Sequence, residues 1–505
     1  MDNQPAKNII EKIKSVILVV LLLLTILLLY FFWKDIEIRE FSLSSILSSD
    51  DSMTADIISP EEIIVPSHVD ICFDDQTYTK IISGREFYWD NDSNLCIKRS
   101  FEKVVSSVDT FTEEISKEQY KEIMEFVSVR AIFDYYVPFV DYCKLLGLNN
   151  PSSTDVIVSV SEIGFSAGSY DSMFIYDGMA DKYYRIVSEN MSEELLARMT
   201  ELAGNENLTY YPLESYVGTS LDKRVLIPSY LETKLQTAVV KNDFTAQDRD
   251  VISDIARTFF SGNFDFVRKI EEESGKVIYM YGYGQKTLIA DIDGTIEYKT
   301  ETMQQPGLMQ VGYFDALEEA LAMAALQGGF KTSYGKELSP YLTYAGTIGN
   351  DGNGYRFEFG IKAEDENLYY EEGSAVEIEI VNGQVSYFRR NFVAADRIEM
   401  YGESKEAYTP INVLAQNYEY MYDLVESTVG FSKEEDPETI DEFNVVASQI
   451  DDMRSGYVFM KKSSAIVPCH IVTMADSILE VYFDIYTAEP LGYSRNDLRR
   501  GNNGL

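Results

Sequence analysis

The stretch AVEIEIVNGQVSYFRR, residues 375–390, decides the fold class. Apolar residues alternate with polar ones on both sides of Asn382-Gly383, and this dipeptide favours the positive backbone angles of a two-residue hairpin turn. The stretch therefore predicts two antiparallel strands joined by a tight turn. A second stretch of the same kind, VIYMYGYGQKTLIADIDGTIEYKT at 277–300, turns at Asp293-Gly294.

Helical patterns precede these strands along the chain. The helical segment 314–329 comes before strands within 355–390, and the helical segments 411–429 and 443–454 come before the C-terminal strands. A weaker copy of the same order occupies 250–300. Recurrence of this kind predicts an α+β ectodomain of several domains, built from repeated units of a helix and an antiparallel meander.

The N-terminal stretch KSVILVVLLLLTILLLYFFWKD, which begins at Lys14, predicts a transmembrane helix. Residues Val16 to Trp33 are 18 residues without a charge. A helix of that length reaches about 27 Å, close to the ~30 Å hydrocarbon thickness of a bilayer. The apolar run ends in aromatic residues and Lys34, whereas a cleaved signal peptide has a shorter core and a site of small residues. We therefore expect an uncleaved anchor.

The charges beside this helix predict its orientation. Lys7, Lys12 and Lys14 precede it, whereas Lys34 and Arg39 are the only basic residues that follow before Lys80. Because basic residues are retained on the cytoplasmic side, the pattern favours a cytoplasmic N-terminus in a single-pass protein of the cell membrane. The bulk of the chain would then be extracytoplasmic.

The composition excludes some classes of partner. The chain has 83 acidic and 43 basic residues, a formal net charge of −40. Such a surface repels phosphate, which makes nucleic acid an unsuitable partner and leaves membrane attachment to the apolar helix. Hydrophobic residues make up 45% of the chain, enough for large cores.

Shifts in pattern along the chain predict its division into segments. The Ser- and Thr-rich stretch after the anchor has the composition of a tether. The predicted divisions are a cytoplasmic tail 1–14, a transmembrane anchor 15–33, a linker 34–60, an N-terminal α+β domain 61–215, a central α+β domain 216–310, and two further units 311–400 and 401–505.

Cysteine and histidine are sparse, and no C-x-x-C pair occurs, so the sequence predicts no metal site. A bridge between Cys72 and Cys96 and two isolated apolar cysteines are both compatible with the sequence. His470 lies in an apolar strand pattern, which favours a core histidine over a catalytic base. The residues concerned are Cys72, Cys96, Cys143, Cys469, His68 and His470.

Gly164-Phe-Ser166-Ala-Gly168 matches the G-x-S-x-G nucleophile elbow of serine hydrolases. A true elbow leads into a helix, but the following residues alternate like a strand, and the base would have to be His470, about 300 residues away. The pattern therefore favours a hairpin turn.

Two other motifs imitate ligand-binding loops. The residues 282–287 end in the Lys-Thr of a phosphate loop but lack its spacing and its helix. Asp291 and Asp293 resemble the start of a calcium loop, but Thr302 stands where that loop needs a bidentate glutamate. Both motifs favour hairpin turns, and the sequence predicts no catalytic residue, no cofactor and no metal.

Several stretches together resemble the YycH family, over about residues 10–495. The two C-terminal units are also similar to the sister family YycI and, more loosely, to PepSY-type modules. The chain departs from the family pattern at Cys469-His470, where an aromatic residue commonly follows the proline, and through its longer acidic middle. The resemblance rests on the anchor and on SPEEIIVPSHVDICF, DKYYRIV, NGQVSYFRR, AIVPCHIV and YFDIYTAEPLGY.

The resemblance implies a non-enzymatic, membrane-anchored regulator of a Gram-positive two-component system that controls cell-wall metabolism. It would act on the sensor histidine kinase through its transmembrane helix and ectodomain, often beside a YycI-like partner. Thr25 is the candidate helix–helix contact, because polar residues join helices in lipid. The alternatives are an anchored envelope binding or assembly protein without a kinase partner and, third, an anchored serine hydrolase that uses Ser166. The residues expected in the anchor and the kinase contact are Val16, Leu21, Thr25, Leu28 and Trp33.

Overall fold

The computed structural model places every described element in one compact unit, Ala55–Leu505. The predicted anchor lies outside the described residues, and its transmembrane character stays a prediction. Within the described ranges, no helix is both long and apolar enough to cross a membrane. The structure describes residues 57–73, 77–82, 97–107, 110–148, 155–188, 195, 209–218, 221, 223–229, 235–245, 248–301, 311–348, 354–363, 366–399, 406–428, 430 and 442–495.

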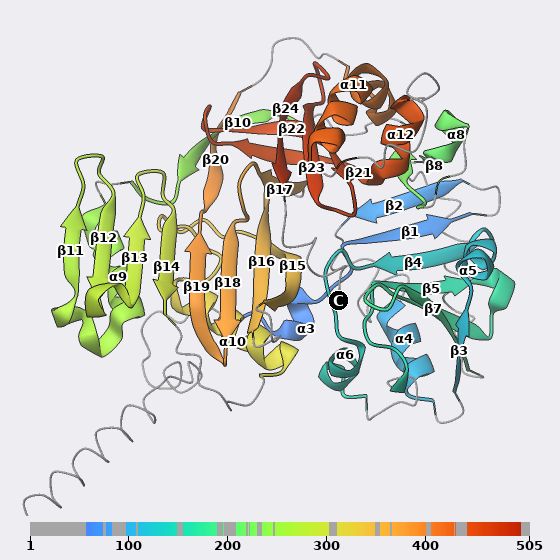
Figure 1. Cartoon of the computed structure of the whole chain (residues 1–505), viewed down its shortest axis with the longest axis horizontal. Coiled ribbons are helices and arrows are strands. Elements are labelled where there is room, and N and C mark those ends of the chain that lie inside the picture. Colours follow the sequence, from blue (N-terminus) through green and yellow to red (C-terminus); the bar gives the residue numbers. More distant parts are fainter. Residues whose placement is uncertain are drawn as a thin grey trace, which may run out of the picture. The chain divides into compact units, whose positions relative to one another are not determined.

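The N-terminal part of the unit is an antiparallel sheet of nine strands in the order β3-β7-β6-β5-β4-β1-β2-β8-β9 (Figure 1). All five residues of the inner strand β1 are buried, which places the core along the middle of the sheet. The strands are β1 (His68–Cys72), β2 (Tyr78–Ile82), β3 (Phe111–Ile115), β4 (Ser128–Ile132), β5 (Glu162–Ser166), β6 (Ser172–Asp177), β7 (Lys182–Val187), β8 (Tyr210–Pro212) and β9 (Leu226–Pro228).

Short amphipathic helices accompany this sheet. In α4, Ile97, Phe101 and Val104 recur at helical spacing and are fully buried. The Phe101 ring contacts Phe139 and Tyr142 of α6, with centroids 6.4 and 5.8 Å apart. The two helices therefore share one aromatic core. The helices are α3 (Pro60–Ile63), α4 (Ile97–Val105), α5 (Lys117–Met124), α6 (Phe139–Leu145) and α8 (Glu214–Val217).

The rest of the unit is a sheet of fifteen strands. Its main path is β11-β12-β13-β14-β19-β18-β16-β17-β21-β22-β10-β20, with β15 beside β16, β23 beside β22, and β24 beside β23. The strands are β10 (Thr237–Asn242), β11 (Arg268–Glu271), β12 (Val277–Tyr281), β13 (Lys286–Ala290), β14 (Ile296–Thr300), β15 (Pro340–Ile348), β16 (Gly354–Ala363), β17 (Glu366–Tyr370), β18 (Val376–Val381), β19 (Gln384–Arg390), β20 (Val393–Glu399), β21 (Ile450–Met460), β22 (Ala465–Met474), β23 (Leu479–Asp484) and β24 (Pro490–Arg495).

Both predicted hairpins are confirmed. Strands β18 and β19 pair antiparallel, and Asn382 and Gly383 between them have positive φ angles of 52° and 75°. Strands β13 and β14 pair in the same way around Gly294, whose φ is 87°. These are the left-handed conformations that Asn and Gly adopt most readily.

The α+β class with antiparallel sheets is confirmed as well. Helix α9 precedes β11–β14, α10 precedes β15–β19, and α11 and α12 precede β21–β24. One prediction is wrong: the helix expected over 443–454 ends at Gln449, and the following residues open strand β21, where Met453 pairs with Val472. The helices are α9 (Arg249–Phe260), α10 (Tyr313–Leu326), α11 (Pro410–Thr428) and α12 (Glu442–Gln449).

Two strand pairings make the second sheet continuous. Strand β14 pairs antiparallel with β19, and β17 pairs in parallel with β21, with Leu368 opposite Tyr457. The β17–β21 pairing joins strands about 90 residues apart in sequence. The predicted boundaries near 310 and 400 adjoin the segments 302–310 and 400–405, which lie outside the described residues. The domain divisions stay predictions.

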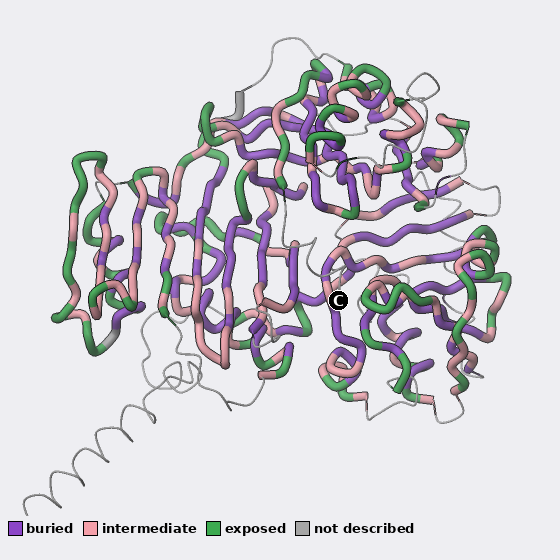
Figure 2. The backbone as a smooth tube through the Cα atoms, viewed as in Figure 1, coloured by how far each residue is buried: buried purple, intermediate pink, exposed green. Residues whose placement is uncertain are grey.

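Buried residues run along the inner strands of both sheets (Figure 2). At the C-terminal end, Val413, Met421 and Leu424 of α11 lie on one face of the helix. They pack with Met453 of β21 and Phe483 of β23 in one hydrophobic cluster. The burial of an amphipathic helix face against a sheet accounts for the stability of this region.

Charged side chains also join the two sheets. Lys80 of β2 forms an ion pair with Asp452 of β21, and the Lys80 side chain is only 3% exposed. Arg454 Nη1 lies 3.3 Å from Asp134 Oδ2, just beyond the end of β4. The boundary between the sheets is therefore held by buried charges as well as by apolar packing.

Candidate functional site

The residues predicted to contact a kinase within the membrane cannot be placed. They lie outside the described residues: Val16, Leu21, Thr25, Leu28 and Trp33. Candidate sites in the structure must therefore be sought in the ectodomain, first among the sequence motifs and then among its cavities.

Ser166 lies in a turn, as the sequence favours. It ends β5, a short 3-10 segment follows, and β6 returns antiparallel. The Ser166 hydroxyl is fully buried, donates to the Ile123 carbonyl at 2.7 Å and accepts from the Gly168 amide at 3.2 Å. A hydroxyl committed to two backbone groups in the core is not placed to attack a substrate.

The two loop-like motifs are also turns. Residues 282–284 form a short 3-10 turn between β12 and β13. Asp293, between β13 and β14, accepts from the Thr295 amide at 3.0 Å, and its Oδ2 lies 2.8 Å from Lys461 Nζ. The Asp293 carboxylate is thus bound by groups of the protein itself, as expected of a residue in a hairpin turn.

His470 is a core histidine, as predicted. It is fully buried; Nδ1 lies 3.0 Å from Ser455 Oγ and Nε2 lies 2.8 Å from the Tyr408 carbonyl. Burial lowers the His470 pKa to about 4, because the charged imidazolium loses its hydration in the core. The neutral ring has a role in packing and hydrogen bonding.

The three cysteines within the described residues are part of the protein core. Cys72, Cys143 and Cys469 are buried. Cys96 lies outside the described residues, so its relation to Cys72 stays open. Among the residues that the structure describes, no three His, Cys, Asp or Glu side chains are grouped so as to hold a metal ion.

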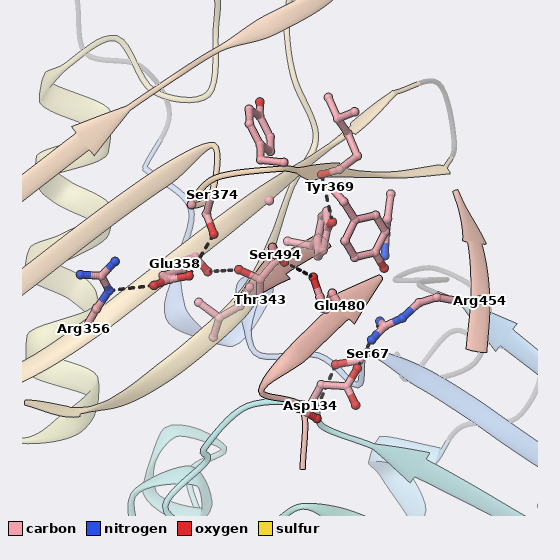
Figure 3. Close-up of a pocket in the computed structure, with 18 of the residues that line it drawn as sticks. Ser67, Asp134, Thr343, Arg356, Glu358, Tyr369, Ser374, Arg454, Glu480 and Ser494 are labelled. Atoms are coloured by element: carbon pink, nitrogen blue, oxygen red, sulfur yellow. Dashed lines mark hydrogen bonds and ion pairs between the residues drawn. The ribbon is translucent and has the colours of Figure 1, made fainter. Parts of the chain in front are cut away.

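A cavity of about 300 Å³ lies where the two sheets meet (Figure 3). One wall comes from the segments that precede β1 and follow β4. The second wall comes from β15, β16 and β17, and the third from β21, β23, β24 and the turn between β22 and β23. The wall residues that matter most for its chemistry are Asp134, Glu358, Asn367, Tyr369, Arg454 and Glu480.

Arg454 is the central cation of the cavity wall. Its Nε lies 3.1 Å from Asp452 Oδ2, and its guanidinium lies over the Tyr369 ring, 5.6 Å from the centroid. Burial alone would lower the Arg454 pKa, but Tyr369 and the surrounding carboxylates, Glu480 among them, raise it well above its usual value. Arg454 is thus fixed in its charged form.

Glu358 anchors a second charged cluster. Arg356 Nε lies 2.7 Å from Glu358 Oε1, and Ser374 donates to Glu358 Oε2 at 3.0 Å. Arg356 also contacts Glu377 and Glu379, at 2.7 and 2.8 Å. These charge-assisted bonds hold the Glu358 side chain in one position at the cavity wall.

Three other wall groups are not satisfied in the same way. The Tyr369 hydroxyl and Asn367 Oδ1 have almost no accessible surface and no hydrogen bond of good geometry within the described residues, but the Asn367 side chain lies close enough to Tyr369 to lower the pKa of its hydroxyl, which burial raises. Glu480 accepts only from neutral hydroxyls, those of Tyr482 at 3.2 Å and Ser494 at 3.5 Å. The Tyr369 and Asn367 oxygens are therefore enclosed by the protein, and Glu480 is the wall group that is bonded only to neutral donors.

Sequence reasoning missed this cavity. Asp134, Tyr369, Arg454 and Glu480 come from segments spread over about 350 residues, and none belongs to a motif. The spacing along the chain carries no signal, because the parallel pairing of β17 with β21 is what brings Tyr369 and Arg454 together. Tyr369 and Asn367 lie in an ordinary strand pattern, ENLYY.

The comparisons with known proteins concern the fold. No protein-family model matches the sequence, and no curated protein is significantly similar to it. The crystal structure of YycH from Bacillus subtilis is 12% identical and has a TM-score of 0.48, covering 84% of this chain and 96% of its own.

Two other solved structures are less similar. An uncharacterized protein from Eubacterium rectale is 14% identical, with a TM-score of 0.33, and covers 54% of this chain and 91% of its own. The C-terminal domain of YpeB from Bacillus megaterium is 12% identical, with a TM-score of 0.24, and the match covers 49% of this chain and 96% of that domain.

Proposed function

We propose that this chain is a non-enzymatic, membrane-anchored regulator that acts outside the cytoplasm on the sensor histidine kinase of a two-component system that controls cell-wall metabolism. The sequence supports the proposal through the apolar stretch 16–33 and through its resemblance to the YycH family. The structure supports it through one observation, the cavity at the junction of the two sheets, whose wall contains both tyrosines and charged residues. Such a cavity is typical of a binding protein.

The position of the cavity suits a regulator. Its walls belong to both sheets and to the C-terminal strands, and the charged contacts between the sheets, Lys80 to Asp452 and Arg454 to Asp134, adjoin it. A ligand there would contact all three walls at once. Occupancy would therefore favour one relative arrangement of the walls, and a kinase that binds this arrangement better would change its signalling state.

The experiment is an affinity purification of the full chain from native membranes. The native chain is compared with a variant in which residues 16–33 are replaced by an unrelated apolar helix of equal length. Recovery of a histidine kinase with the native helix, reduced by the replacement, is the expected result. Thr25→Val serves as a matched point variant, because it removes the hydroxyl and keeps the shape of the side chain.

The result that would overturn the proposal is recovery of envelope proteins but no kinase with either helix. That outcome would favour the second candidate, an anchored envelope binding or assembly protein that uses the same cavity. The third candidate, a hydrolase that uses Ser166, lacks a supporting observation, because the Ser166 hydroxyl is buried and bonded to backbone groups.

A further inference from the structure

The turn between β12 and β13 presents a tyrosine to the solvent. Tyr283 lies between Gly282 and Gly284 and its side chain is fully exposed. Its φ is 59°, in the left-handed region that residues with a side chain avoid, whereas the two glycines, at 60° and 104°, adopt positive φ without that cost. A fully exposed ring in an unfavourable backbone conformation adds nothing to the core. This observation points to a contact outside the folded chain.

A second exposed ring lies at the same end of the sheet. Phe266 ends the segment η4 (Ser261–Phe266), just before β11, and is 77% exposed. Arg268 of β11 pairs with Met280 of β12, so Phe266 and the turn after β12 are at the same end of these strands. Tyr283 and Phe266 are called here the aromatic tip. Large apolar side chains gathered at one exposed end of a sheet are typical of an interaction site.

The charge around the aromatic tip differs from that of the whole chain. The chain has a net charge of −40. The charged residues at this end of β11–β14 and of α9, together with their ion-pair partners, are balanced, so phosphate headgroups are not repelled here as they are by the chain as a whole. The cations are Arg257, Arg268, Lys269, Lys286 and Lys299, and the carboxylates are Asp254, Asp265, Glu271, Glu297 and Glu301.

The linker is long enough for this end of the ectodomain to reach the bilayer. Residues 34–56 separate the predicted anchor from Ile57, the first described residue. A flexible linker of this length spans roughly 26 Å on average and about 80 Å at most. Helix α3, which follows Ile57, and the β12–β13 turn both lie in the lower half of the unit in Figure 1. The aromatic tip is therefore on the side of the unit at which the described chain begins.

A lipid surface suits the aromatic tip better than a protein partner does. A stable protein interface buries about 800 Å² on each partner, which two rings at the end of a sheet do not supply. Aromatic rings are enriched at the headgroup level of a bilayer, where one side of the ring is in apolar surroundings and polar neighbours stay hydrated.

We propose that the aromatic tip, Tyr283 and Phe266, inserts into the headgroup region of the membrane that holds the anchor. A contact in addition to the anchor fixes the orientation of the ectodomain over the bilayer, and with it the face that a membrane-bound kinase meets. The inference rests on the proposed function, because it requires an anchored chain. It adds lipid as a direct partner of the ectodomain.

The test is the quenching of a tryptophan by phosphatidylcholine that is brominated near the headgroup ends of its acyl chains. The full chain with Trp33→Phe, Trp89→Phe and Tyr283→Trp is reconstituted in phosphatidylcholine vesicles with and without the brominated lipid. The matched control carries Tyr170→Trp instead, at a 72% exposed position in the turn before β6. The tip tryptophan should be quenched at least about twofold more than the control. Equal quenching would overturn the proposal.

A second pair of variants tests the contribution of the other ring. In the chain with Tyr283→Trp, Phe266→Ser should reduce the quenching at least about 1.5-fold, because the tip loses one of its two rings. Phe111→Ser, at a 62% exposed position on β3, should leave the quenching unchanged. Both side chains are exposed, so neither variant should lower the unfolding temperature. Equal effects of the two variants, or no effect of Phe266→Ser, would contradict the assignment.

Flotation of the vesicles through a density gradient separates the failure of the anchor from the failure of the tip. A chain that does not float with the vesicles would overturn both the anchor and this inference. A chain that floats but shows equal quenching at Tyr283→Trp and Tyr170→Trp would overturn this inference alone. No kinase is present in the test, so its result is independent of whether a kinase is recovered from native membranes.

Discussion

The turn at Ser166 and the cavity between the sheets teach opposite lessons. The turn carries a recognisable motif, yet its hydroxyl is fully buried and bonded to the Ile123 carbonyl and the Gly168 amide. The cavity has no motif, yet its wall brings together Asp134, Arg454 and Glu480 from segments far apart in the sequence. Whether a side chain can bind a ligand thus depends on the contacts that it makes in the folded protein. A short sequence motif does not show those contacts.

The largest expected effect comes from removing the cation that the cavity shares with both sheets. Arg454→Met would leave Asp134 and Asp452 with less compensation in a buried site, and should lower the free energy of unfolding by about 3–5 kcal/mol. Chemical denaturation of the full chain would measure it. Arg257→Met, at an exposed pair with Asp254, is the control and should cost less than about 0.5 kcal/mol. Equal costs would show that the cavity wall is no more constrained than the surface.

The next effect concerns His470, a buried residue whose two ring nitrogens are hydrogen-bonded. Its pKa falls from 6.5 to about 4 on folding, so the unfolded chain binds the proton more tightly. Its contribution to stability is therefore complete above about pH 6.5 and is lost as the pH falls towards 4, by about 3 kcal/mol. Denaturation curves between pH 7 and 4 should show a smaller pH dependence in His470→Gln than in the native chain.

The native chain also contains His68, whose pKa is lowered as well. His68→Gln should therefore reduce the pH dependence in the same direction, and the double variant should reduce it further. A pH dependence unchanged by His470→Gln would contradict the view that His470 is a neutral core residue.

A smaller effect distinguishes the turn from a catalytic elbow. Ser166→Ala removes the donor to the Ile123 carbonyl and the acceptor for the Gly168 amide, and should cost about 1–2 kcal/mol. Ser448→Ala removes an exposed hydrogen bond to the Val445 carbonyl and should lower the free energy of unfolding by less than about 0.5 kcal/mol. Complete loss of function in Ser166→Ala, with stability intact, would return the hydrolase to consideration.

The smallest effect is expected at the Tyr369 hydroxyl in the cavity wall. Tyr369→Phe removes a hydroxyl whose contact with the Asn367 side chain lacks good hydrogen-bond geometry, and should change the unfolding free energy by less than about 0.5 kcal/mol. Tyr370→Phe removes a buried bond to the Asn391 carbonyl and should cost about 1 kcal/mol. A larger cost at Tyr369 than at Tyr370 would show that the Tyr369 hydroxyl already has a structural partner.

The sequence predicted what depends on neighbouring residues. Asn382-Gly383 and Asp293-Gly294 specify their turns, because each dipeptide sets its own backbone angles. The end of α12 was missed, because Met453 lies in a strand whose partner, Val472, is not adjacent in sequence. Helical spacing alone cannot show where tertiary pairing takes over.

The cavity was beyond prediction for the same reason. Arg454 reaches Asp134 across 320 residues, and no local pattern encodes that distance. Ser166 lies in a motif of five neighbouring residues, which the sequence shows directly. Glu480 belongs to no such motif, so the sequence did not indicate it. The predicted anchor, including Thr25, lies outside the described residues and depends on the membrane experiments.

The most direct test of the central claim is the autophosphorylation rate of the histidine kinase that co-purifies with the full chain, reconstituted with it in vesicles. The rate is measured for the kinase alone, with the native chain, and with the variant in which residues 16–33 are replaced by an unrelated apolar helix. We predict that the native chain changes the rate at least threefold and the variant less than 1.5-fold. Equal rates for the kinase with and without the native chain would contradict a regulator of that kinase.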